Sequence, residues 1–291
     1  MTLGELIACT ARRLAAARLH YGHGTDNPRD EAAYLVLRGL DLPFDHGLKD
    51  EVTETQQRRV ASLLRKRIRD RMPVAYLLNE AWLGGLPFYV DRRVIVPRSH
   101  IAELLHQRLR PWLRRAPKRI LDLCTGSGCL AVLAAKAFPG VAVDATDISP
   151  SALAVAAMNV KKYQLAQRVR LVRSDLFSSL QNLRYDLIVT NPPYVTTPSL
   201  RRLPPEFRYE PASALAGGRQ GLEFVSRILE RAREHLNPGG VLACEVGANR
   251  RALERAYPRL PLLWPQDEVF IWEASRTDAG SGARPRHAAA R

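Results

Sequence analysis

Between residues 119 and 274 the chain alternates short apolar runs with longer helical stretches, and this alternation restricts its fold more than any other feature. Apolar runs of this length are typical of strands that are buried on both faces of a sheet. Strands separated by helices indicate an α/β domain with a parallel, doubly wound sheet. The expected strands are 119–124, 141–146, 169–173, 185–190, 240–246 and 269–274, and the expected helices are 128–138, 150–163 and 221–236.

The part of the chain before this alternation has a different texture. Three helical segments are expected, near 2–20, 29–40 and 53–71, and the third has an apolar face. That face consists of Val60, Leu63, Leu64 and Ile68. A Gly-Gly pair, aromatic residues and alternating valines then predict a β-hairpin. We therefore expect a helical domain at 1–72, a β-hairpin linker at 73–98, an α/β domain at 99–276 and a low-complexity, disordered tail at 277–291.

The composition argues against a membrane protein and against a metal site. No apolar run reaches the length of a bilayer span, and the charges near the start are interspersed, unlike those of a signal peptide. We therefore expect a cytoplasmic protein. Its cysteines show neither CxxC spacing nor a set of histidine partners, so buried thiols are expected and no metal. The cysteines are Cys9, Cys124, Cys129 and Cys244.

The charge balance is strongly basic, with 44 Lys and Arg against 29 Asp and Glu, a formal net charge of +15. Much of the excess lies in residues 58–71, which hold seven basic residues and one acidic one, and in residues 108–119, which hold six basic residues and no acidic one. Such runs are consistent with solvated helix faces and equally with a contact to nucleic acid or ribonucleoprotein. Charge alone does not decide between them.

The turn after the first expected strand reads LDLCTGSGC. Glycines at 126 and 128 let the backbone approach a ligand at a helix N-terminus, where open α/β sheets bind nucleotides. A dinucleotide-binding loop would have a third glycine at position 131, which is Ala131. The pattern is closer to the D-x-x-x-G-x-G loop of S-adenosylmethionine enzymes, although a tight turn without a ligand is the alternative. The candidate cofactor residues here are Asp122, Cys124, Thr125, Gly126, Ser127 and Gly128.

Two further carboxylates follow the next two expected strands. Asp147 is suited to accept hydrogen bonds from both hydroxyl groups of a ribose, or alternatively to cap the following helix. Asp175, followed by Leu176, is suited to accept a hydrogen bond from the amino group of adenine, although an isolated acidic loop residue is usually just solvated. Together with the glycine loop, these residues predict an adenosine pocket at the carboxyl ends of the strands.

The segment VTNPPYV, residues 189–195, ends an apolar strand with a rigid elbow, because two prolines cannot extend a sheet ladder. An amide or exocyclic amino nitrogen is a poor nucleophile, since its lone pair is delocalised. The Asn191 side-chain oxygen and the Pro192 carbonyl could each accept one N–H of such a group and aim its lone pair at a methyl group. An ordinary Asn-Pro turn is the alternative. The candidate catalytic residues are Asn191, Pro192 and Tyr194, and with Pro193 they are the candidate substrate contacts; Asn191 is also a candidate cofactor contact.

Several motifs together resemble the bacterial protein-glutamine amide methyltransferases. They are DLCTGSGC, TDISPSALAVAAMN, SDLF, NPPYV, EPASALAGGRQGLEFV and LNPGGVLACEVG. The resemblance covers nearly the whole chain. It implies a Rossmann-like, seven-stranded class I methyltransferase domain that uses S-adenosyl-L-methionine, preceded by a helical substrate-recognition domain. From the elbow itself, we expect Tyr194 to pack against the planar amide of the substrate.

The linker bears on which branch of this family the chain resembles. One branch acts on peptide release factors and carries Pro-Arg-Pro followed by an acidic stretch, whereas the branch that acts on large-subunit ribosomal protein three carries Pro-Arg-Ser. Here Ser99 and His100 follow Pro97 and Arg98, and Cys124 stands where many such loops carry a glycine. Both features are similar to the ribosomal branch, which implies methylation of a glutamine in that ribosomal protein.

Three other functions stay open at this point. They are methylation of a release factor, methylation of an amino group in nucleic acid, and a nonenzymatic role as a basic assembly factor. Against a nucleic-acid substrate, residues 1–72 show no aromatic and basic stacking platform. Because the ribosomal protein is itself basic, we expect an RNA-containing assembly intermediate to be a better substrate than the free protein. The cleft between the domains, walled by the loop 195–218, is the expected docking surface.

Overall fold

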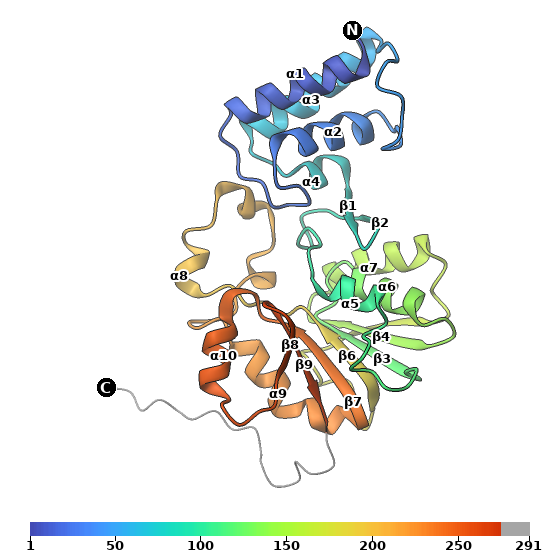
Figure 1. The fold of residues 1–291 in the computed structure, drawn as a ribbon, viewed down its shortest axis with the longest axis vertical. Helices are drawn as coiled ribbons and strands as arrows, with labels where there is room; N and C mark the ends of the chain where they lie inside the picture. The colour runs from blue at the N-terminus through green and yellow to red at the C-terminus, as the bar shows by residue number, and fades with distance from the viewer. Residues whose placement is uncertain (275–291) are drawn as a thin grey trace.

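The computed structural model describes residues 1–274, so the tail expected at 277–291 lies outside the described residues. Its centre is a seven-stranded sheet with the strand order β5-β4-β3-β6-β7-β9-β8 (Figure 1). A separate antiparallel pair is formed by β1 and β2. The strands are β1 Glu80–Leu83, β2 Leu86–Tyr89, β3 Arg119–Leu123, β4 Ala142–Asp147, β5 Val169–Arg173, β6 Tyr185–Thr190, β7 Leu236–Glu245, β8 Leu263–Gln266 and β9 Val269–Glu273.

The sheet is parallel from β5 to β7 and antiparallel at its other edge. The strand β9 pairs with β7 in the antiparallel sense, and β8 pairs with β9 in the same way. The expectation of a parallel sheet is therefore confirmed from β5 to β7 and wrong at this edge. The two edge strands are joined by only Asp267 and Glu268, and a two-residue connection can join only antiparallel neighbours. The strand β8 was not expected, since it is four residues long and contains Pro265, which an edge strand tolerates.

The helices fall where the sequence pattern places them, with boundaries shifted by a few residues. Three helices of the α/β region, α5, α8 and α10, were not predicted, because helices of four to seven residues are too short to show a clear apolar period. The α-helices are α1 Leu3–Ala16, α2 Pro28–Gly39, α3 Glu54–Arg69, α4 Val74–Leu78, α5 Ile101–His106, α6 Cys129–Ala137, α7 Pro150–Lys162, α8 Thr197–Leu200, α9 Glu223–His235 and α10 Arg250–Ala256; 3-10 turns lie at Pro205–Tyr209, Ala212–Ala214 and Gly247–Asn249.

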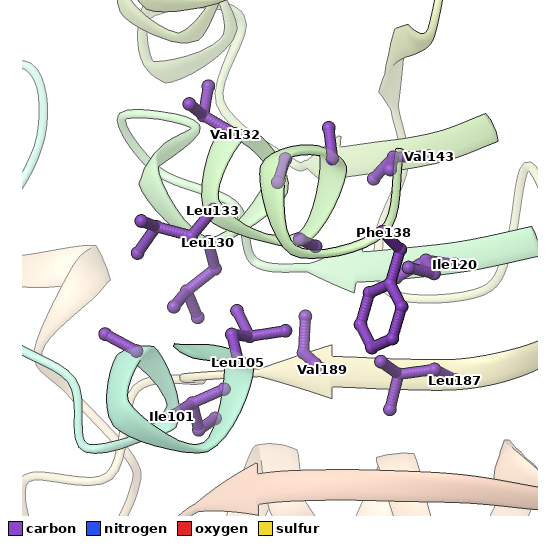
Figure 2. Packing of buried hydrophobic residues seen from close by; sticks show 14 of the residues in the cluster. Ile101, Leu105, Ile120, Leu130, Val132, Leu133, Phe138, Val143, Leu187 and Val189 are labelled. Atoms are coloured by element: carbon purple, nitrogen blue, oxygen red, sulfur yellow. The ribbon is translucent and has the colours of Figure 1, made fainter. Parts of the chain in front are cut away.

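Helices cover both faces of the sheet, because successive side chains of each strand point to opposite faces. On one face, α5, α6 and α7 pack over residues such as Val189 of β6. Figure 2 shows Ile101 and Leu105 of α5 lying in one apolar cluster with Leu130 of α6 and Val189. On the other face, α9 and α10 pack over a second cluster that includes Ile188 of β6. The sheet is thus enclosed, and only its strand ends are available for a site.

The helices α1 to α4 form a small module above the sheet (Figure 1). Both α1 and α3 begin with a capping box, in which Thr2 and Thr53 accept a hydrogen bond from the third helical residue. On α3, Val60 and Leu64 are buried, as the apolar face predicted. No helix among residues 1–274 is long and apolar enough to cross a bilayer.

The expected β-hairpin exists but is shorter than the linker 73–98 to which it was assigned. The strands β1 and β2 pair from Glu80 to Tyr89, around a turn at Gly84 and Gly85. Both glycines have positive φ, as a two-residue hairpin turn requires. Before the hairpin the chain forms the helix α4, and after it the chain runs without regular structure to α5.

A buried ionic cluster joins the helical module to the long loop that follows β6. Arg67 of α3 is only 1% exposed and donates to the Glu31 carboxylate at 2.7 Å and to the His20 carbonyl at 2.8 Å. It also lies 3.5 Å from Glu206 in that loop, and Arg71 pairs with the same carboxylate at 2.8 Å. In Figure 1 this loop, which carries α8, reaches up beside the module.

Candidate active site

The expected site residues lie close together at the carboxyl ends of the central strands. In the ladder, Leu123 of β3 is paired with Thr146 of β4 on one side and with Thr190 of β6 on the other. The glycine loop, Asp147 and Asn191 follow these three positions directly. Residues that are far apart in the sequence are therefore neighbours at this edge, where open α/β sheets hold their ligands.

The glycine loop has the backbone conformation that its sequence requires. Gly126 and Gly128 have φ of 55° and 80°, and Cys124 has φ of 57°, in the left-handed region that favours glycine. This explains why a glycine is common at the position of Cys124. A Cβ atom at Gly126 would have no neighbour within 4 Å, so this side of the loop is open. Gly128 packs closely against Ala156 of α7.

A buried asparagine that sequence reasoning missed supports the same loop. Asn159 of α7 is fully buried and donates to the Ser127 carbonyl at 2.8 Å. Its amide also exchanges two hydrogen bonds with the backbone of Tyr89 at the end of β2, at 2.7 and 2.9 Å. Asn159 therefore ties the hairpin to the glycine loop. Its only signal in the sequence is an amide on the apolar side of a helix.

The carboxylate of Asp147 holds the glycine loop from the neighbouring strand. One of its oxygens accepts from the Gly126 N–H and the other from the Ser149 N–H, both at 2.9 Å. Burial raises the pKa of Asp147, and these backbone hydrogen bonds oppose the shift. Asp147 thus faces the loop, and the helix α7 is capped instead by Ser149, which accepts from the Ala152 N–H.

Asp122 lies beneath the loop and has one unsatisfied oxygen. It is fully buried, and its Oδ2 accepts from the Thr125 hydroxyl at 2.5 Å. Its Oδ1 is buried without a hydrogen-bond partner among residues 1–274. Burial raises the pKa of Asp122 to about 7. A buried acceptor without a donor is costly in a finished structure, so this atom fits a site that is completed by a ligand with N–H groups.

Asp175 and Leu176 follow β5 at the same edge of the sheet. The Asp175 side chain is 46% exposed, and it forms an ion pair at 2.8 Å with Arg227 of α9. Leu176 is buried and has φ of 48°. Asp175 therefore lies at the expected strand end, but its carboxylate has a partner within the protein that the sequence did not suggest.

The elbow after β6 is anchored to the segment that follows the hairpin. The Asn191 side-chain nitrogen donates to the Arg98 carbonyl at 3.1 Å. This bond uses the side-chain nitrogen, so the Oδ1 atom of Asn191 is the atom that can accept a hydrogen bond from a substrate. Arg98 is itself fixed, because its guanidinium binds both oxygens of the buried Glu210 at 2.7 Å. The orientation of Asn191 is thus set by two segments that are distant in the sequence.

Tyr194 is held at three points. Its hydroxyl donates to Glu245 at 3.3 Å, its carbonyl accepts from the Asn249 side chain at 2.8 Å, and its ring lies directly against Gly247. A Cβ atom at position 247 would come within 2.5 Å of the ring, so only glycine fits there. Burial, with a contribution from Glu245, raises the pKa of Tyr194. The phenol is therefore neutral and fixed in place.

Ser99 and His100, the linker residues that resemble the ribosomal branch, are connected to Tyr194 through Glu245. The Ser99 hydroxyl donates to Glu245 at 2.6 Å, and the His100 N–H donates to the same oxygen at 3.1 Å. Glu245 is 2% exposed, and burial raises its pKa. A cavity of about 240 Å³ lies beside this contact. It is lined by Arg98, Ser99, His100, Tyr194, Glu245 and Glu268.

Comparisons with known proteins find relatives that cover most of the chain. Residues 101–202 match the methyltransferase small domain family. The chain is 52% identical over 268 residues to a ribosomal protein uL3 glutamine methyltransferase from Bordetella pertussis, with 90% of each chain covered. It is 47% identical to a protein of the same name from Bradyrhizobium diazoefficiens, over 96% of this chain and 92% of that one.

Among solved structures, the catalytic domain of hMettl16 in complex with the MAT2A 3'UTR hairpin 6 shares the fold. The TM-score is 0.51 at 15% identity, and the alignment covers 79% of this chain and 87% of that one. At this identity the likeness concerns the architecture alone.

Among residues 1–274, no group of three or more His, Cys, Asp or Glu side chains could hold a metal ion.

Proposed function

Because the chain belongs to the family of ribosomal protein uL3 glutamine methyltransferases, we propose that it transfers a methyl group from S-adenosyl-L-methionine to the side-chain amide nitrogen of a glutamine in ribosomal protein uL3. The observation that carries this function is the elbow at Asn191. Its amide nitrogen is tied to the Arg98 carbonyl, so its oxygen is left to receive an N–H of the substrate. The elbow lies at the sheet edge that also holds the glycine loop.

The residues at that edge fit S-adenosyl-L-methionine. When bound, this cofactor supplies a methyl group on a positively charged sulfur atom. Asp122 offers a buried, unpaired carboxylate oxygen suited to its ammonium group, and Asp147 offers a carboxylate suited to ribose hydroxyl groups. The open side of Gly126 lets the backbone approach the ligand. Cys124, Thr125, Ser127 and Gly128 shape the same loop, and Asp175 with Leu176 borders the adenine end.

Orientation of the substrate nitrogen is the chemical task of the elbow. The Asn191 oxygen and the Pro192 carbonyl each accept one N–H of the glutamine amide, which directs the nitrogen lone pair at the methyl group. Pro193 keeps the backbone rigid at this point. The fixed ring of Tyr194 packs against the planar amide. No strong base is needed, because the amide proton becomes acidic only after the methyl group has been transferred.

The rest of the chain serves substrate recognition in this proposal. Residues 1–72 form the recognition domain, residues 73–98 the linker and residues 99–276 the catalytic domain. The protein acts in the cytoplasm, where ribosomal proteins assemble with RNA. Because enzyme and substrate are both basic, an RNA-containing assembly intermediate is a better substrate than free uL3. The +15 charge of the chain and its long loop beside the helical module support this arrangement.

A methylation assay tests the proposal. The enzyme is incubated with labelled S-adenosyl-L-methionine and, in parallel, with uL3, with a peptide release factor and with naked ribosomal RNA. Mass spectrometry then identifies the labelled residue. Label on a glutamine of uL3 is the expected result. Efficient labelling of the release factor alone would show that the assignment to the ribosomal branch is wrong while glutamine methylation is right. Labelling of RNA alone would refute a protein substrate.

Replacement of Asp147 by alanine is expected to weaken binding of S-adenosyl-L-methionine by at least about tenfold. The substitution removes hydrogen bonds to a charged acceptor, each of which contributes roughly 1.5–3 kcal/mol. It also releases the Gly126 N–H that the carboxylate now holds. Calorimetric titration measures the affinity. Asp45→Ala, an exposed aspartate of the helical module, is the control. An unchanged affinity in Asp147→Ala would refute the assignment of this residue.

A further inference from the structure

The two basic runs of the chain, residues 58–71 and 108–119, have different surroundings in the structure. In residues 58–71 most of the positive charge is neutralised by acidic side chains of the protein itself. Arg67 is buried in the ionic cluster, so it cannot meet a partner. The remaining pairs are Arg58 with Glu54, Arg59 with Asp41, Arg69 with Asp70 and Arg71 with Glu206. This run mainly stabilises the helical module.

The segment between α5 and β3 keeps its charge exposed. Arg108, Arg110 and Arg115 are exposed, and no acidic partner is found for them among residues 1–274. Arg114 is 81% exposed and lies 3.9 Å from Glu273, at the limit of an ion pair. We call Arg108, Arg110, Arg114 and Arg115 the arginine cluster. A surface ion pair as long and as exposed as that of Arg114 is weak and easily exchanged for another anion.

The arginine cluster surrounds one hollow of the surface. The four arginines line a cavity of about 180 Å³ together with Leu113, Ala116 and Phe138. Phe138 and Leu113 pack into the core, so the floor of the hollow is firm. Arg168 donates to the Phe138 carbonyl at 3.4 Å and to the Ala135 carbonyl at 3.0 Å, which places a fifth guanidinium close to this floor. Guanidinium groups bind phosphate with a fork of donors, which suits such a hollow.

The arginine cluster lies at the opposite end of the sheet from the methyl-transfer site. Its segment leads directly into the first residue of β3, Arg119, whereas the glycine loop follows the last residue of β3. A strand rises about 3.3 Å per residue, so the two places are separated by roughly 17 Å or more. A polyanion bound at the cluster would leave the cofactor site and the elbow accessible.

We propose that the arginine cluster is an RNA-binding surface. It contacts phosphate groups of ribosomal RNA while the site at the carboxyl ends of the strands methylates uL3. The inference rests on the proposed function for the identity of the RNA. RNA is favoured over an acidic protein because four exposed arginines around one hollow match the closely spaced phosphates of a nucleic-acid backbone. The net charge of +15 also attracts a long polyanion from a distance.

Two double variants with equal loss of charge test the proposal. Arg114→Ser/Arg115→Ser removes two members of the arginine cluster, and Arg58→Ser/Arg59→Ser removes two adjacent, exposed arginines from the other run. Binding of a fluorescein-labelled hairpin from large-subunit ribosomal RNA is followed by anisotropy at several salt concentrations. The first variant is expected to bind at least about tenfold more weakly, with a salt slope reduced by about one to two, because each lost phosphate contact lowers the slope by nearly one. The second is expected to stay within about twofold of the parent.

The outcomes separate this inference from the proposed function. Arg114→Ser/Arg115→Ser is expected to methylate free uL3 at the parental rate, since the cluster lies away from the site. Equal weakening of RNA binding in both double variants, or no weakening in either, would overturn the proposal. Competition by polyglutamate as effective as that by RNA of equal charge would overturn it too. If parent and variant both fail to methylate uL3 but differ in RNA binding, the proposed function falls while the RNA surface stands.

Discussion

Asn191→Ala is expected to lower turnover by about two orders of magnitude or more while leaving the affinity for S-adenosyl-L-methionine within a few-fold of the parent. The alanine removes the oxygen proposed to orient the substrate nitrogen, and orientation matters more in the transition state than in the ground state. The glycine loop and Asp147 do not depend on Asn191 for their hydrogen bonds. Single-turnover kinetics on uL3 and calorimetry with the cofactor give the two quantities.

Two further variants sharpen this experiment. Gln181→Ala removes an exposed side-chain amide far from the elbow and is expected to behave as the parent. Asn191→Asp keeps an acceptor oxygen but replaces the N–H donor to Arg98 with a carboxylate, so it tests whether that anchor matters. A parallel loss of cofactor affinity and turnover in Asn191→Ala would mean that the residue builds the cofactor pocket and does not orient the substrate.

The sequence predicted the elements that carry a strong local signal. The strands YDLIVT and VRLVR have the bounds that were expected, because continuous apolar or alternating runs bounded by turn residues leave little choice. The turn after β3 follows its glycines, since Gly126 and Gly128 both adopt the positive φ that glycine favours. The antiparallel edge was missed because strand direction depends on the connection through α10 and β8, and both elements are short.

The supporting contacts of the site were beyond sequence reasoning for a physical reason. Asn191 is anchored by a backbone carbonyl, that of Arg98, and every residue has a carbonyl, so no residue type marks such a partner. Glu245 lies within an apolar strand pattern that gives it no role, although it connects Ser99 with Tyr194. The difference between Ser99 and a proline in the linker therefore has a structural meaning, because a proline at that position could not donate to Glu245.

The basic run on α3 contains a helical spacing that a count of its charges does not reveal. Val60, Leu64 and Arg67 follow one another at intervals of four and three residues, so Arg67 lies on the buried face of the helix and not on its solvated side. An arginine at such a position is expected to need buried acidic partners. The structure provides them in Glu31 and Glu206, from two different segments.

Arg67→Leu is accordingly expected to lower the free energy of unfolding by about 3–5 kcal/mol, because it leaves the buried Glu31 carboxylate without its cationic partner. Glu206 keeps its ion pair with Arg71, so Glu31 bears most of the loss. The loop that carries Glu206 also loses a contact to the helical module. Urea unfolding followed by circular dichroism measures the stability, and limited proteolysis within residues 195–218 reports on the loop.

The matched control for this variant is Arg65→Leu on the same helix. Arg65 is exposed, so its replacement is expected to change the stability by no more than about 0.5 kcal/mol. The double variant Arg67→Leu/Glu31→Leu removes both buried charges and is expected to recover much of the stability, because an apolar pair of similar volume replaces an ion pair at little cost. If Arg67→Leu were as stable as Arg65→Leu, the buried cluster would not be what joins the module to the loop. The loop would then depend on its other contacts, such as those of Glu210 with Arg98 and the Val96 N–H and those of Arg208 and Tyr209 with the Asp70 carbonyl.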